Sequence, residues 1–172
     1  MATVACRDET EDVASIIEFA QARSDDAFWS DPLVCLALFE LNFSAQSQRQ
    51  LAKETIDVYQ RLLALAKLHA AVSVELEDKA PSLDGSLLQV REQASGMASV
   101  VVSRLRSEGG DHVDAEKSIN VLRSCLTEQR FAREAAYREA KQIWGSDSVE
   151  RTTGLDDKMV SALTRAAEGP SL

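Results

Sequence analysis

Glycine, proline and aromatic residues are scarce in this chain of 172 residues, which has 7 glycines, 3 prolines and only 5% Phe, Trp and Tyr. Turns need glycine and proline, and strands favour aromatic residues, so this composition argues against a β-sandwich or barrel and favours long helices. Hydrophobic residues make up 45% and charged residues 27% of the chain, which is usual for a globular domain and argues against bulk disorder. The length permits one domain with a sizeable core.

Positive charge is also in deficit, with 19 Lys and Arg against 28 Asp and Glu and a net charge of −9. Nucleic acids and anionic membranes both attract positive surfaces, so we expect no nucleic-acid partner and disfavour a membrane partner. Even the cluster formed by Arg130, Arg133, Arg138 and Lys141 alternates with glutamates and is nearly neutral. No apolar run approaches the roughly 18 residues that span a bilayer. The expected partners are other protein chains, themselves helical, in a hetero-complex or a homo-oligomer.

Cysteine is limited to Cys6, Cys35 and Cys125, with no CxxC pair. An odd number of cysteines cannot form a closed disulfide framework. Because Cys35 and Cys125 have apolar neighbours, we expect both to be small core residues. The first residues show no basic stretch followed by an apolar one, which is the pattern of a secretory signal. These features predict a reducing, intracellular compartment, the cytoplasm, with the nucleus left open.

The longest helix is expected at residues 44–79, a stretch without glycine or proline. Apolar residues recur there every seven residues in one row, Leu51, Val58, Leu65 and Val72. A second row lies four residues further on and contains Leu62 and Leu76. This first heptad seam is typical of a helix packed lengthwise on another helix, and it predicts a rod about 50 Å long. Pro81 ends the rod and Ser82 caps the next helix, 83–105, which carries a second seam. Their short connection predicts an antiparallel hairpin.

The predicted fold class is all-α: an elongated antiparallel helical bundle with a coiled-coil-like hairpin and short flanking helices. We expect a single all-helical domain over residues 1–172. Its parts are a frayed N-terminus at 1–8, short helices within 9–43, the hairpin at 44–107, a third long helix at 111–145, and a linker with a short C-terminal helix at 146–172. The clearest loop, around Gly109 and Gly110, separates the hairpin from the third long helix.

Catalytic and metal-binding motifs are absent from the sequence. Neither histidine belongs to a Glu-x-x-His or HExxH motif, and no GxSxG, GxGxxG or GxxxxGK[ST] motif occurs. His69 lies in the first seam, where a polar residue more often sets helix register than binds a metal. Cys125 has no histidine near it in sequence to activate the thiol. We therefore expect no enzymatic activity, no metal and no cofactor.

Residues 33–43, LVCLALFELNF, contain only two polar side chains. A helix that is apolar on every side must be covered on every side, either by the short N-terminal helix of the same chain or by another protein. We predict the second, because aromatic anchors are typical of interface hot spots. The partner-binding residues predicted on this basis are Phe28, Trp29, Leu33, Leu36, Phe39 and Phe43.

The predicted function is that of a non-catalytic helical subunit or adaptor of a multi-protein assembly, a scaffold that binds partner chains through apolar helix faces. The alternative hypothesis is a peripheral membrane-associated helical module in trafficking or membrane remodelling. The acidic balance counts against the alternative, because helices that bind membrane surfaces usually carry a face of Lys and Arg. Helical periodicity by itself does not separate these two classes.

Overall fold

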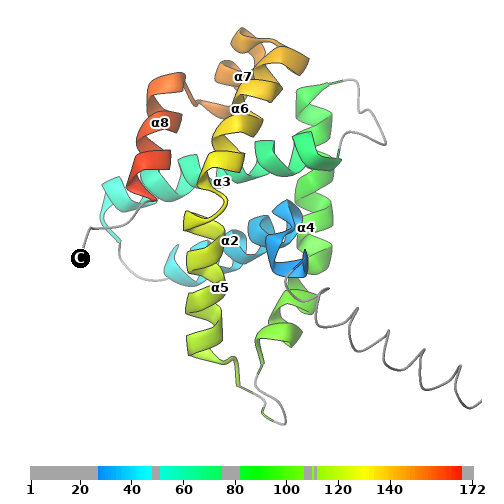
Figure 1. Ribbon diagram of the computed structural model, residues 1–172, viewed down its shortest axis with the longest axis vertical. Helices are drawn as coiled ribbons and strands as arrows, with labels where there is room; N and C mark the ends of the chain where they lie inside the picture. Colours follow the sequence, from blue (N-terminus) through cyan, green and yellow to red (C-terminus); the bar gives the residue numbers. More distant parts are fainter. Residues whose placement is uncertain (1–26, 48–50, 75–81, 107–109, 111, 168–172) are drawn as a thin grey trace, which may run out of the picture.

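The protein is described by a computed structural model that covers residues 27–47, 51–74, 82–106, 110 and 112–167. The helices are α2 (Pro32–Ser47), α3 (Lys53–Val74), α4 (Leu83–Leu105), α5 (Ala115–Thr127), α6 (Arg130–Trp144), α7 (Ser146–Thr153) and α8 (Asp157–Ala166). They pack on one another as a helical bundle (Figure 1), which confirms the all-α prediction. The predicted N-terminus at 1–8 and the helix expected after it lie outside the described residues.

The N-termini of α2 and α4 follow from local capping chemistry. Pro32 opens α2, where its missing N–H would have no helical partner in any case. The Oδ1 atom of Asp31 accepts a hydrogen bond of 2.9 Å from the Leu33 N–H. Ser82 caps α4 in the same way, with its Oγ accepting from the Gly85 N–H at 3.1 Å. Both caps satisfy backbone donors that a helix leaves free at its first turn, and the Ser82 cap is the one predicted above from the sequence.

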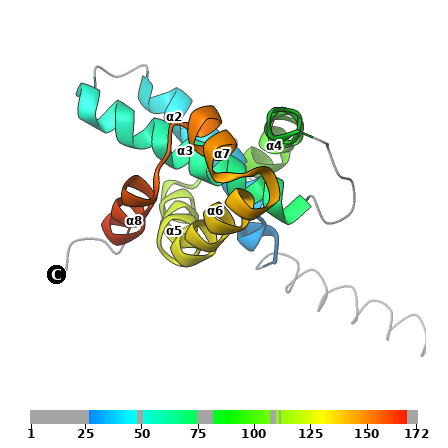
Figure 2. The ribbon, with the colours of Figure 1, turned by 90° about the horizontal axis from the view of Figure 1, so that it is seen from above.

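Helices α2 and α3 form the middle layer of the bundle. They run side by side in opposite directions, with α4 on one side and α5 and α6 on the other (Figures 1 and 2). Six consecutive residues of α2 are buried: Val34, Cys35, Leu36, Ala37, Leu38 and Phe39. A helix contacted from several sides has no solvent face along that stretch, which explains why residues 33–43 are apolar all round. The cover comes from α3, α4 and α5 of the same chain.

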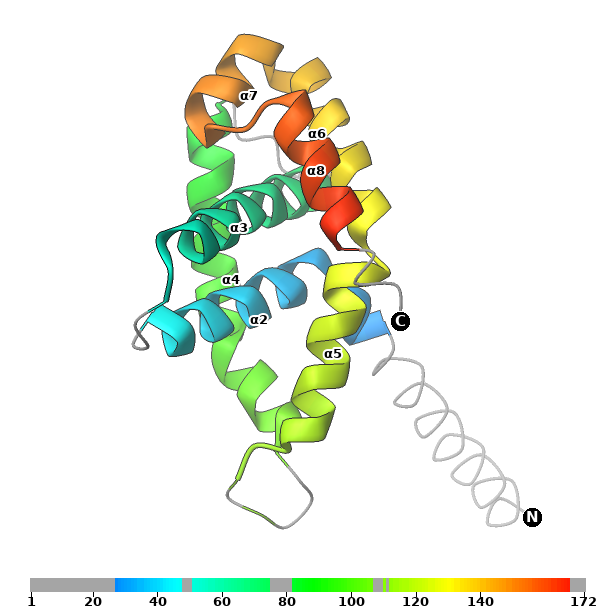
Figure 3. The same cartoon turned by 90° about the vertical axis from the view of Figure 1, so that its left-hand side faces the viewer.

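Helix α4 crosses the middle layer steeply, as Figure 3 shows. The bundle therefore differs in arrangement from the expected hairpin, because the antiparallel neighbour of α3 is α2, and α4 contacts both. The expected rod at 44–79 is also divided, since α2 continues to Ser47 and α3 begins at Lys53. A seam of apolar residues requires cover along its length, but several helices that cross it in turn can provide that cover.

The third long helix expected at 111–145 is two helices, α5 and α6. Arg133 of α6 reaches back to the end of α5, where its Nη2 donates to the Leu126 carbonyl at 2.6 Å and its Nη1 donates to the Cys125 carbonyl. Arg130 donates to a third carbonyl, that of Thr127. These bonds satisfy carbonyls that α5 leaves free at its C-terminus, where positive charge is also favoured. The arginines therefore stabilise a break that the apolar pattern does not show.

The linker expected at the start of 146–172 is helix α7, over residues 146–153. Gly154 follows it with φ of 70°, a left-handed conformation that glycine adopts without steric cost. Asp156 then caps α8, with its Oδ1 accepting a hydrogen bond of 2.8 Å from the Met159 N–H. The short C-terminal helix is thus confirmed, and its cap is Asp156.

Cys35 of α2 and Cys125 of α5 form a disulfide, with their Cα atoms 5.8 Å apart. Both are buried in the core, as the sequence predicts. The disulfide itself was not predicted, because an odd number of cysteines excludes a closed framework but still allows one pair. The third, Cys6, lies outside the described residues. The pair removes one premise of the predicted reducing compartment, which stays a prediction.

Candidate functional site

The six residues predicted to bind a partner lie in α2 and just before it, where the chain's own helices cover them. Leu36 and Phe39 are 0% and 1% exposed. The other four, Phe28, Trp29, Leu33 and Phe43, are half-buried. A partner could reach Leu36 or Phe39 only if α2 left the core, so these two side chains do not form an accessible binding surface.

The aromatic residues before α2 anchor it within the fold. The rings of Phe28 and Trp29 pack edge to face, with centroids 4.9 Å apart. The guanidinium of Arg104 in α4 lies 4.1 Å from the Phe28 centroid. The Trp29 carbonyl oxygen lies 3.5 Å from the Sγ of Cys35 and 3.7 Å from that of Cys125. These contacts tie the start of α2 to α4 and α5, which is an internal role for side chains expected at an interface.

An apolar groove of about 390 Å³ lies between α3, α5 and α8, which meet on the side shown in Figure 3. Its lining is Val58 and Leu62 from α3, Ile119, Leu122, Arg123, Leu126 and Thr127 from α5, Leu163 and Ala166 from α8, and Ala167 just after α8. Val58 and Ile119 are 48% and 55% exposed, which is high for large aliphatic side chains. Contiguous exposed apolar surface of this kind marks interaction sites on soluble proteins. This groove is the candidate functional site.

Arg123 is the charged member of the groove lining, and its side chain is exposed. Within the described ranges its guanidinium forms no ion pair. The groove therefore combines an apolar floor with an unneutralised positive charge. An arginine in this position can form bidentate bonds with a carboxylate that approaches from outside.

Sequence reasoning did not find this groove, although it assigned several of its residues to apolar faces. Val58 and Leu62 belong to the first seam, and Ile119 lies within the third long helix expected at 111–145. The groove exists because α8 lies near α5 and near the N-terminal half of α3. That proximity joins segments about 100 residues apart, as the positions of Val58 and Leu163 show. The sequence shows no sign of this proximity, because the exposure of Val58 at the end of the first seam is seen only in the structure.

His69 of α3 is buried, with 9% of its surface exposed, which agrees with its expected place in the core rather than in a solvated position. Burial and, to a smaller extent, the nearby positive charge of Arg133 together lower the pKa of its imidazole to about 4. The imidazole is therefore neutral at pH 7. Arg133 is itself buried, and burial lowers the pKa of its guanidinium to about 10, so it stays charged.

Acidification should destabilise the protein through His69. In the unfolded chain the imidazole has its ordinary pKa near 6.5, so below that pH the unfolded state binds a proton that the folded state binds only near pH 4. The free energy of unfolding should fall by up to about 3 kcal/mol between pH 6.5 and pH 4 from this group, and no further below pH 4. Urea unfolding of wild type and His69→Gln across this range measures the difference.

The matched control is His112→Gln, because His112 is exposed. That variant should keep the wild-type pH dependence, whereas His69→Gln should flatten it. Parallel curves for wild type and His69→Gln would show that His69 is not held neutral in the core.

Comparisons with protein-family models, curated proteins and solved structures give no match to this chain. None of the helices in the described ranges has both the length and the apolar character needed to cross a membrane. Among the same residues, no three His, Cys, Asp or Glu side chains are grouped so that they could hold a metal ion.

Proposed function

We propose that this protein is a non-catalytic helical subunit or adaptor that binds an amphipathic helix of a partner chain in the groove between α3, α5 and α8. The observation that carries this proposal is the exposure of Val58 and Ile119 at an apolar groove otherwise lined by leucine, alanine and threonine side chains around Arg123. The proposal retains the function expected from the sequence and moves the contact surface from residues 28–43 to the groove.

The shape of the groove favours a helix as its occupant. Three helices supply the walls, and their aliphatic side chains present the kind of surface that receives residues spaced three and four apart on one helical face. Arg123 adds a preference for an acidic residue beside the apolar face of the partner. A partner helix with leucine or isoleucine on one face and a glutamate or aspartate at its edge fits both features.

Charge placed in the groove should abolish partner binding without unfolding the protein. Because Ile119 is more than half exposed, Ile119→Asp should leave the helical circular dichroism signal unchanged. The desolvated carboxylate should weaken a reconstituted complex about a hundredfold or more. The chains to test are those that co-purify with wild type from the native source and are lost with Ile119→Asp, and their affinity is then measured with purified components.

Val100→Asp is the matched control, because Val100 is 43% exposed on α4 and does not line the groove. This variant should bind every groove partner as wild type does. If wild type, Ile119→Asp and Val100→Asp retain the same partners with the same affinity, the groove is not the binding surface.

A further inference from the structure

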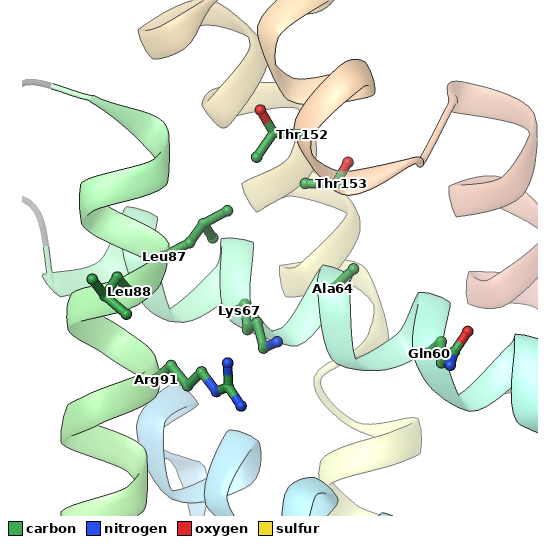
Figure 4. A pocket seen from close by; sticks show the side chains of 8 residues that line it. All are labelled: Gln60, Ala64, Lys67, Leu87, Leu88, Arg91, Thr152 and Thr153. Atoms are coloured by element: carbon green, nitrogen blue, oxygen red, sulfur yellow. The ribbon is translucent and has the colours of Figure 1, made fainter.

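A second cleft, of about 300 Å³, lies between α3, α4 and α7 and has a different chemistry from the groove. Two cations line it, Lys67 from α3 and Arg91 from α4. Figure 4 shows their side chains reaching out in the same direction from neighbouring helices, with Leu87 further along α4. Within the described part of the chain, no carboxylate lines this cleft. In a protein of net charge −9, two cations that share a cleft without an acidic neighbour are unexpected.

Neither cation is neutralised by a carboxylate of the described residues. Lys67 is half-buried and Arg91 is exposed, and neither forms an ion pair or a side-chain hydrogen bond within the described ranges. The cleft between α6 and α8 provides the contrast. There Lys141 Nζ lies 3.2 Å from Glu150 Oε1 and 2.7 Å from Asp157 Oδ1, so its charge is matched internally. Among the residues that the structure describes, the charge in the cleft of α3, α4 and α7 has no such match.

We infer that this cleft binds a phosphate monoester that carries a small apolar group. Two adjacent cations match the nearly double negative charge of a phosphate monoester at neutral pH. The fork of Arg91 can bind two of the phosphate oxygens at once, while Lys67 acts as a point charge. Ala64, Leu87 and the exposed Leu88 give the apolar group a surface to pack on, and the Gln60 amide supplies a further polar contact. The volume suits a small ligand.

The test uses the full chain and phenyl phosphate, with binding measured by calorimetry at constant ionic strength set with sodium chloride. Wild type should bind and should gain thermal stability as phenyl phosphate is added. Arg91→Gln and Lys67→Gln should each weaken binding about tenfold or more, because each removes a charge-assisted contact. Arg165→Gln changes the net charge equally on the exposed face of α8, outside this cleft, and should bind as wild type does.

A phosphate monoester can be a soluble molecule or the headgroup of phosphatidic acid, so a second arm uses phosphatidylcholine vesicles with and without phosphatidic acid. Binding of phenyl phosphate alone assigns the site to a soluble ligand. Binding to phosphatidic acid vesicles that both cleft variants lose assigns it to a lipid headgroup. The inference is overturned if neither probe binds, or if Arg91→Gln and Lys67→Gln bind as tightly as Arg165→Gln. Since the groove variant Ile119→Asp leaves this cleft intact, either result is independent of the proposed partner binding.

Discussion

Reduction of the Cys35–Cys125 disulfide is expected to lower the free energy of unfolding by about 4 kcal/mol. The two cysteines are 90 residues apart in sequence, so the bond closes a long loop in the unfolded chain. For a loop of that size the chain-entropy model gives about 4 to 5 kcal/mol. The bond also joins α2 in the middle layer to α5, and both cysteines are buried. Urea unfolding of wild type, refolded with and without a phosphine reductant, measures the change.

Two variants separate the disulfide from other effects of the reductant. Cys6→Ala should respond to the reductant as wild type does, whereas Cys35→Ala with Cys125→Ala should not respond at all. Alkylation of the denatured, unreduced protein should leave Cys35 and Cys125 unmodified in the mass spectrum. A wild-type stability that is the same with and without reductant, or alkylation of all three cysteines before reduction, would contradict the pairing.

Helix existence and several helix ends were predictable, because they depend on local chemistry. Asp31 and Pro32 mark the start of α2, and Ser82 marks the start of α4. The predicted helix at 83–105 has the bounds of α4, Leu83–Leu105. Its predicted seam is also buried or half-buried along its whole length, from Leu83 to Leu105. Each of these features depends on interactions between residues that are a few positions apart, and such patterns are visible in a single sequence.

The break between α5 and α6 was not predictable from apolar spacing, because its cause is a long-range polar contact. In the sequence Arg133 belongs to a nearly neutral cluster of basic residues, yet its side chain is 2% exposed and donates to the carbonyls that end α5. The Phe39 ring lies 5.7 Å from its guanidinium and belongs to the middle layer. Sequence pattern assigns an arginine to solvent unless the partner groups that permit its burial are already known.

The candidate site was more difficult to predict from the sequence, because a groove forms only where no other part of the chain covers an apolar face. The first seam predicts equal burial for residues seven apart, but Val58 is 48% exposed, whereas Leu65 is 1% and Val72 is 7% exposed. The C-terminal half of α3 lies in contact with residues of α4, α6 and α7, and the N-terminal half borders the groove. Periodicity identifies an apolar face, but the tertiary arrangement decides how much of that face is buried.

Leu65→Asp is expected to destabilise the protein by about 4 kcal/mol or more. Leu65 packs in the core cluster that includes Leu68, Tyr137, Val149 and Leu155, and it is 1% exposed. The substitution removes a buried aliphatic side chain and puts an unpaired carboxylate in its place, and both changes oppose folding. Protonation of the buried carboxyl would relieve part of the cost, so the loss should be largest at neutral pH. Urea unfolding at pH 7 measures it.

Val58→Asp is the matched comparison, because Val58 occupies the same heptad position one repeat earlier in α3. Its side chain is almost half exposed, so the new carboxylate remains hydrated and stability should change by less than about 1 kcal/mol. The same carboxylate lines the groove and should weaken partner binding as Ile119→Asp does. The two substitutions thus separate folding from binding along one row of α3. Equal losses of stability in Leu65→Asp and Val58→Asp would mean that the row is uniformly buried and that no groove is open at its N-terminal end.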